Sequence, residues 1–217
     1  VSVEETPESF QIRRSNGLMI QSVLKHYCIL AARLHLTDDH DIIKSELDRF
    51  LQAYDVLLMT GGVSMGKFDY VPQILENLGV KKLFHKVRQR PGKPFWFGTY
   101  HDQQLIFAFP GNPVSVFMCL HRYFIPWLES SLKVENSSPQ YAVLQNDIHF
   151  PYPLQYFAQV KLEVNHQGIL TARAIESNGS GDFSHLIFTD AFVELPSEKK
   201  EFKKGEMYKV WKYNFKS

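Results

Sequence analysis

The run "DVLLMTGG", residues 55–62, constrains the fold more than any other stretch of the chain. A short, continuous apolar segment closed by two glycines is typical of a strand that is buried on both faces of a parallel sheet. Such a strand needs helices above and below it to keep water away. The sequence therefore predicts an α/β fold, with a layered α/β/α domain and a mostly parallel sheet around this strand.

The neighbouring segments support the same arrangement. Apolar residues recur at helical spacing over residues 43–51 and 71–78, and Gly79 is placed to end the second helix. A long apolar helix is expected over residues 114–132. Short strand-like runs separate these helices, at residues 29–36, 82–87, 94–100 and 104–109. Because ligands in layered α/β sheets bind beyond the carboxyl ends of strands, the loops at residues 60–69 and 109–113 are the first places to look for a site.

A second domain is indicated after the polar stretch "VENSSPQ", residues 134–140. Beyond it the pattern is almost wholly strand-like, with short strands separated by "NHQG", "SNGSGD" and "KKG". Closely spaced short strands of this kind predict a small all-β, barrel-like C-terminal domain. We therefore predict an α/β domain over residues 1–135 and a β domain over residues 139–217.

Composition excludes several classes of protein. With 24 basic and 23 acidic residues the formal net charge is +1, which provides no general attraction to nucleic acid or to an anionic membrane. No run of about 18 apolar residues exists. Cys28 and Cys119 stand far apart in apolar surroundings and are predicted to be buried free thiols. We expect a cytoplasmic protein, and the missing initiator Met suggests an N-terminally truncated α/β domain.

The stretch "MTGGVSMGKFD", residues 59–69, is close to a nucleotide-binding P-loop. A P-loop needs a Ser or Thr directly after its Lys, because that hydroxyl binds magnesium, and Phe68 stands in that place. The loop still suits a phosphate or a pterin, since glycine can adopt φ > 0 and let the backbone approach a ligand. A tight connection that binds nothing remains the alternative. The candidate ligand-binding residues are Gly61, Gly62, Ser64 and Gly66.

Two further segments could bind anions. In "PGNPVS", residues 110–115, Pro113 suits the first turn of a helix, whose N–H groups could bind an anion together with Ser115. The alternative is a Pro-rich helix entry without a ligand. In "RQRPGKP", residues 88–94, three cations surround a rigid turn, which indicates an anion clamp or else a solvated basic hairpin.

Taken together, four segments resemble the molybdopterin molybdenumtransferases, the MoeA-like family that includes the C-terminal part of gephyrin. The segments are "SNG", "TGGVSMGKFDYV", "FHKVRQRPGKPFWFG" and "FPGNPVSVF", and they occur in the family's order and spacing. The resemblance implies a molybdopterin-binding α/β domain followed by a small β-barrel. It also implies the family's reaction, in which molybdate is inserted into adenylylated molybdopterin and AMP is released.

The resemblance also assigns site residues. It places catalytic acidic residues at Asp38 and Asp69, which would hold Mg²⁺, and catalytic basic residues at Lys86 and Arg90. Molybdate is a dianion, and Lys86, Arg90 and Lys93 are the cations that could bind it. The resemblance implies a homodimer whose active cleft is shared between subunits. The implied binding residues for molybdopterin are Gly61, Gly62, Ser64, Gly66, Lys93, Pro110, Gly111, Asn112 and Ser115.

The chain departs from the family pattern at some positions. Arg14 stands where the family commonly has Asp, and Gln155 and Gln159 stand where it commonly has arginines. The family's two N-terminal domains and the first strand of its α/β domain have no counterpart in these residues. Two other functions remain open: a molybdopterin adenylyltransferase of the same fold, and a scaffold or interaction module. The sequence also leaves open whether the oxyanion is molybdate or tungstate.

Overall fold

The computed structural model describes Thr6, Glu8 and residues 14–37, 39–63, 70–134, 138–175 and 183–213. Internal contacts divide the chain into two compact units. The first unit comprises residues 1–86 and 94–117, and the second comprises residues 87–93 and 118–217. The segment at 87–93 therefore belongs to the second unit, although its neighbours along the chain belong to the first.

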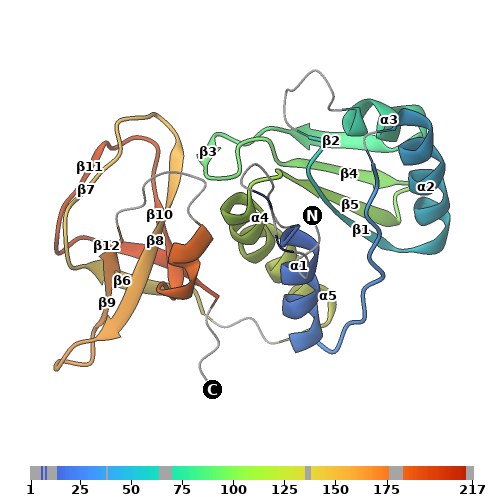
Figure 1. The fold of residues 1–217 in the computed structure, drawn as a ribbon. Coiled ribbons are helices and arrows are strands. Elements are labelled where there is room, and N and C mark those ends of the chain that lie inside the picture. Colours follow the sequence, from blue (N-terminus) through green and yellow to red (C-terminus); the bar gives the residue numbers. More distant parts are fainter. Residues whose placement is uncertain are drawn as a thin grey trace. The chain divides into compact units, whose positions relative to one another are not determined.

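The first unit is built on a four-stranded sheet in the order β1-β5-β4-β2 (Figure 1). Its strands are β1 (Val56–Thr60), β2 (Lys81–His85), β4 (Trp96–Tyr100) and β5 (Gln104–Phe109). The layered α/β fold is confirmed, but the sheet is mixed rather than mostly parallel: β1 pairs with β5 in parallel, and the other two pairs are antiparallel. The reason is the tight turn after Tyr100, where His101 and Asp102 have positive φ and fold β4 directly back onto β5.

Helices cover the sheet of the first unit. They are α1 (Asn16–His26), α2 (His40–Ala53), α3 (Val71–Asn77) and α4 (Pro113–Cys119). The helices α2 and α3 lie on one face of the sheet, where Leu47, Leu51 and Ile74 pack in one cluster with Trp96 and Ile106. The two predicted amphipathic helices at 43–51 and 71–78 are thereby confirmed.

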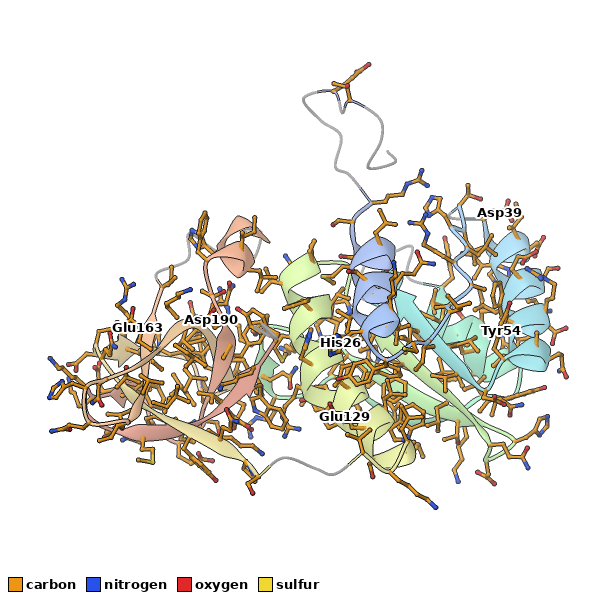
Figure 2. The ribbon with its side chains drawn as sticks, turned by 90° about the horizontal axis from the view of Figure 1, so that it is seen from below. His26, Asp39, Tyr54, Glu129, Glu163 and Asp190 are labelled. Atoms are coloured by element: carbon orange, nitrogen blue, oxygen red, sulfur yellow. The ribbon has the colours of Figure 1, made fainter. Side chains whose placement is uncertain are left out.

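The ends of these helices follow from their sequences. Asp39 caps α2 by accepting hydrogen bonds from the backbone N–H groups of Asp41 and Ile42, and Figure 2 shows it at the opposite end of that helix from Tyr54. Gly79, with φ 89°, follows α3 as expected. Among the described helices, none combines the length and apolar character that crossing a bilayer requires.

Burial in the sheet differs from the expectation for β1. Within β1 only Leu57 is buried, whereas four consecutive residues of β5, from Ile106 to Phe109, are buried. The two strands differ in burial because of their places in the sheet. The strand β5 has a neighbour on both sides, whereas β1 pairs on one side only within the described residues. The apolar run correctly identified a strand of a layered sheet but not its place at the edge.

The predicted strand at residues 29–36 is wrong. The segment has no regular secondary structure, and Leu30 and Leu34 are exposed. A strand needs a neighbour for its backbone N–H and C=O groups, and this segment pairs with none of the described strands. Cys28, in the turn that precedes it, has φ 58° and is exposed, contrary to the prediction of a buried thiol, while Cys119 is buried as predicted.

The second unit is mainly a closed sheet. Its strands are β3 (Gln89–Arg90), β6 (Gln140–Leu144), β7 (Ile148–His149), β8 (Gln155–Val164), β9 (Leu170–Ala174), β10 (Ala191–Leu195), β11 (Glu201–Phe202) and β12 (Met207–Lys212). The order β10-β12-β6-β9-β8 closes on itself because β8 also pairs with β10. The expected barrel-like domain is confirmed. Short side chains such as Ala158, Ala172 and Ala191 fill its narrow interior.

Helical segments complete the second unit. A π-helical turn η1 (Leu120–Phe124) follows α4 and leads into α5 (Ile125–Ser131), and a short 3₁₀ helix η2 (Phe183–Ile187) precedes β10. The long helix expected over residues 114–132 therefore exists with a widened turn inside it. The strand β3 joins the sheet by pairing in parallel with the start of β8, where Gln89 lies opposite Gln155.

Candidate functional site

Two loops meet at the carboxyl ends of the parallel strands β1 and β5. The first is the glycine loop, described here over residues 61–63, and the second is the PGNP loop, residues 110–113. The Gly61 N–H donates to the Phe109 carbonyl at 3.1 Å, and a Cβ added to Gly111 would lie 3.7 Å from the Gly61 Cα. The two loops predicted from sequence as ligand sites are thus neighbours in the first unit.

The glycine loop needs its glycines for two different reasons. Gly61 has φ 84° and an added Cβ would meet nothing within 4 Å, so conformation alone requires glycine there. Gly62 has φ 71°, and a Cβ would lie 2.6 Å from the Val71 side chain, so both conformation and space require it. The backbone of the loop at Gly62 therefore packs directly against the Val71 side chain at the start of α3.

The PGNP loop is fixed from both sides. The side chain of Asn112 caps α4, because its Oδ1 accepts from the Ser115 N–H at 3.1 Å and from the Ser115 hydroxyl at 3.3 Å. Asn16, from α1, donates to the Gly111 carbonyl at 2.8 Å. Ser115 is 6% exposed and has a capping role in this structure, so its predicted ligand role stays a prediction. Pro110 is buried, and Gly111 is exposed at the end of β5.

The end of β2 is tied to the glycine loop. The His85 Nε2 lies 3.2 Å from the Val63 carbonyl oxygen. Lys86 follows with φ 71°, an uncommon conformation for a residue that has a side chain, while its N–H donates to the Phe95 carbonyl at 2.9 Å. The Lys86 side chain is exposed, and none of the described acidic residues forms an ion pair with it.

The basic turn, residues 88–93, lies in the second unit and carries the other predicted cations. Arg88, Arg90 and Lys93 are exposed, and none of them pairs with an acidic residue in the described part of the chain. The Arg88 guanidinium donates to the Pro153 carbonyl at 3.1 Å, and that of Arg90 lies 5.6 Å from the centre of the Tyr152 ring. The turn therefore offers positive charge that the described acidic residues do not neutralise.

A hollow of about 340 Å³ borders the basic turn within the second unit. Its acidic residue, Glu194, is already bound: it accepts from Gln155 at 3.1 Å and from Trp211 at 2.7 Å, and it lies 3.8 Å from the Arg122 guanidinium. Gln155, one of the departures from the family pattern, thus holds a carboxylate. The lining residues are Val87, Arg88, Gln89, Arg122, Tyr123, Gln155, Phe157, Glu194 and Ser197.

Four predicted site residues lie outside the described residues, namely Asp38, Ser64, Gly66 and Asp69. The two aspartates are the predicted magnesium ligands. No group of three His, Cys, Asp or Glu side chains suited to a metal occurs in the described part of the chain. The assignment of Asp38 and Asp69 as magnesium ligands therefore stays a prediction.

Sequence reasoning missed several residues that shape these loops. Asn16 and His85 fix loop carbonyls through their side chains, and Gln89 is buried inside the basic turn. Asn16 belongs to the "SNG" segment, which is one of the four that resemble the family but was assigned no role in the site. A single Gln between two arginines gives no sign that it is buried.

Comparison with known families divides the chain in two. A family described as a probable molybdopterin binding domain matches residues 3–130. A second family, described as the MoeA C-terminal region (domain IV), matches residues 141–213. The two matches follow each other in the order that the sequence led us to expect.

Individual relatives give the same result. A molybdopterin molybdenumtransferase of Synechocystis sp. is 38% identical over 210 residues, covering 96% of this chain and 51% of the relative, and one of Bacillus subtilis is 30% identical, covering 97% and 49%. A crystal structure of the molybdopterin biosynthesis moeA protein from Pyrococcus horikoshii OT3 aligns with a TM-score of 0.74 at 28% identity, covering 97% of this chain and 50% of the other. The chain spans about half the length of the curated relatives it matches.

Proposed function

We propose that this chain acts in molybdenum cofactor biosynthesis, because it belongs to the MoeA family. It has a molybdopterin binding domain followed by the MoeA C-terminal region. The proposed reaction inserts molybdate into adenylylated molybdopterin and releases AMP. The observation that carries the proposal is the meeting of the glycine loop and the PGNP loop at the ends of β1 and β5. Loops in this position are where layered α/β sheets bind their ligands.

The two loops would bind the phosphate-bearing part of the substrate. Gly61 and Gly62 present backbone without side chains, and the capped start of α4 directs N–H groups toward the same end of the sheet. Binding by backbone groups fixes the phosphate without requiring a charged side chain in the loop. Asn16 and Asn112 keep the PGNP loop in place for this role.

The cations would bind molybdate and offset negative charge on the reacting phosphate. Arg90 and Lys93 are exposed in the basic turn, and Arg guanidinium groups match oxyanions with two parallel hydrogen bonds. Lys86 would supply a further positive charge from the end of β2. Removing one such donor typically costs about 3 kcal/mol of transition-state stabilisation.

Asp38 and Asp69 are proposed to hold Mg²⁺, which when bound would offset charge on the phosphate oxygens. We also propose that the protein works in the cytoplasm as a homodimer with a shared active cleft. Membership of the family and the predicted residue roles support these proposals.

Release of AMP tests the proposal. The natural protein that carries these 217 residues is incubated with adenylylated molybdopterin, magnesium and molybdate, and AMP is measured with and without molybdate. Wild type should release AMP in a molybdate-dependent way, and Asp69→Ala should abolish release. Unchanged release in Asp69→Ala would contradict the assignment of that residue.

A matched pair of glycine variants tests the loops. Gly61→Ala and Gly168→Ala introduce the same side chain at φ 84° and φ 78°, and neither meets an atom within 4 Å. Both should lose similar stability, about 1 kcal/mol. Only Gly61→Ala should raise the KM for adenylylated molybdopterin, and equal KM values in the two variants would argue against the glycine loop as the binding site.

A further inference from the structure

The side chain of Gln89 is buried in the middle of the basic turn. Gln89 is 1% exposed, while Arg88 and Arg90 on either side of it are exposed. This alternation is that of a strand, and Gln89 lies in β3. Burying an amide side chain is unfavourable unless its donors and acceptor are satisfied, so the contacts of this side chain explain why it is tolerated there.

The contacts of Gln89 tie the turn to Cys119 at the end of α4 and to Tyr123 in η1. The Tyr123 hydroxyl donates to the Gln89 Oε1. The Gln89 Nε2 donates to the Pro91 carbonyl at 3.2 Å and, more weakly, to the Cys119 Sγ at 3.7 Å. One buried side chain therefore bonds both to the backbone of its own turn and to the helix beneath it.

Gly92 lets the backbone of the turn pack closely against Cys119 and Met118 as well as against Gln89. A Cβ at Gly92 would lie 2.5 Å from the Cys119 Sγ, 2.9 Å from the Gln89 Nε2 and 3.0 Å from the Met118 Cε. The Val87 N–H donates to the Lys93 carbonyl at 2.9 Å and closes the loop at its ends. The backbone that carries the cations thus rests directly on a packed surface with no spare volume.

The two side chains that support the turn, Gln89 and Tyr123, are uncharged, although Arg122 and Glu194 lie near Tyr123. Neither the amide of Gln89 nor a protonated Tyr123 hydroxyl competes for the arginines, and burial is the main reason why the pKa of Tyr123 is raised to about 12. A carboxylate at position 89 would lie beneath the turn and lower its positive potential, which would reduce its attraction for an anion. The arrangement keeps the positive charge of the turn available at its exposed side.

We propose that Gln89 and Tyr123 are positioning residues that hold the basic turn so that Arg88, Arg90 and Lys93 bind one oxyanion together. This inference rests on the proposed function, in which the oxyanion is molybdate. The inference explains how the cations are positioned. The buried amide of Gln89 and the hydroxyl of Tyr123 hold the turn in place without touching the ligand.

Titration with molybdate alone tests the inference in the natural protein. Gln89→Leu keeps the size of the side chain and removes its hydrogen bonds, and Tyr123→Phe removes only the donor. We expect each variant to weaken molybdate binding roughly tenfold. This is the change in affinity that corresponds to the free energy of about one hydrogen bond. The matched controls are Gln145→Leu, which loses bonds to Thr171 and Glu163, and Tyr213→Phe, which loses a bond to Thr189.

A double-mutant cycle separates positioning from simple loss of stability. Because Gln89 acts partly through Arg90, Gln89→Leu should weaken molybdate binding less in the Arg90→Ala background than in wild type. Additive effects, or an unchanged affinity in Gln89→Leu, would overturn the inference. A wild-type protein that binds no molybdate would instead overturn the proposed oxyanion site itself, so the two failures can be told apart.

The variant Gln89→Glu gives an independent readout. It keeps the shape of the side chain and adds a negative charge beside Arg88 and Arg90. Molybdate affinity should fall more than in Gln89→Leu, because a carboxylate beneath the turn also lowers the positive potential at its exposed side. Affinity equal to that of wild type would contradict the need for an uncharged support.

Discussion

The glycine and PGNP loops differ from the basic turn in what holds them in place. The loops follow two parallel strands, and their shape comes from backbone: positive φ at Gly61 and Gly62, and a capped helix start at Asn112. The basic turn is held by side-chain contacts with Cys119 and Tyr123, about thirty positions further along the chain. The backbone features of the loops can be recognised from sequence, whereas the distant side chains that support the basic turn cannot.

The largest effect should come from crowding the glycine loop. Gly62→Ala places a Cβ 2.6 Å from Val71 at a strained φ, and we expect it to lower the free energy of unfolding by about 3 kcal/mol. Gly61→Ala is the control, because it has the strain without the clash and should cost about 1 kcal/mol. Denaturant unfolding of both variants measures the difference, and equal costs would show that Val71 moves aside freely.

Crowding the basic turn should cost less. Gly92→Ala meets the ends of the Cys119, Gln89 and Met118 side chains rather than backbone, and we expect a loss of about 2 kcal/mol together with weaker molybdate binding. Gly205→Ala, at φ 90° and in open space, is the control for conformational strain. A Gly92→Ala variant that binds molybdate as wild type does would show that the turn tolerates movement.

The helix cap in the PGNP loop should have a smaller effect again. Asn112→Ala removes the acceptor for the Ser115 N–H and hydroxyl and should cost about 1 kcal/mol in thermal or chemical unfolding. Ser115→Ala retains the backbone part of the cap and should cost less. If Ser115→Ala weakens substrate binding while stability is nearly unchanged, the serine binds ligand as well as capping the helix.

The smallest expected effect is on how the free energy of unfolding depends on pH, and it concerns Tyr123 beneath the basic turn. Tyr123 has its pKa raised from 10.0 to about 12, mainly by burial, so the folded state keeps its proton when the unfolded state has lost it. Its contribution to stability is complete below pH 10 and is lost as the pH rises toward 12. Tyr123→Phe should therefore reduce the fall in unfolding free energy between pH 10 and pH 12. An identical fall in wild type and variant would contradict the burial of this hydroxyl.

The sequence was sufficient for most of the fold. The helices at 43–51 and 71–78, the strand at 56–60 and the β-barrel of the second unit were predicted because each has a local pattern of its own. The strand expected at residues 29–36 was wrong, since pairing partners cannot be read from a local pattern. The mixed character of the sheet was missed because the direction of a strand depends on which strands pair with it, and no single segment shows that.

The site was predicted in part. The meeting of the two loops follows from their places after β1 and β5. The capping role of Asn112 could have been expected from its position before Pro113. Gln89 and Tyr123 could not, because the sequence does not reveal which of several polar residues in a basic segment points inward.

A crossed binding experiment tests the central claim that the loops and the basic turn recognise different ligands. Adenylylated molybdopterin and molybdate are each titrated into wild type, Gly61→Ala and Arg90→Ala. We predict that Gly61→Ala weakens binding of the pterin nucleotide and leaves molybdate binding unchanged, and that Arg90→Ala does the reverse. The account would be contradicted if both variants weakened both ligands equally, or if neither changed either affinity.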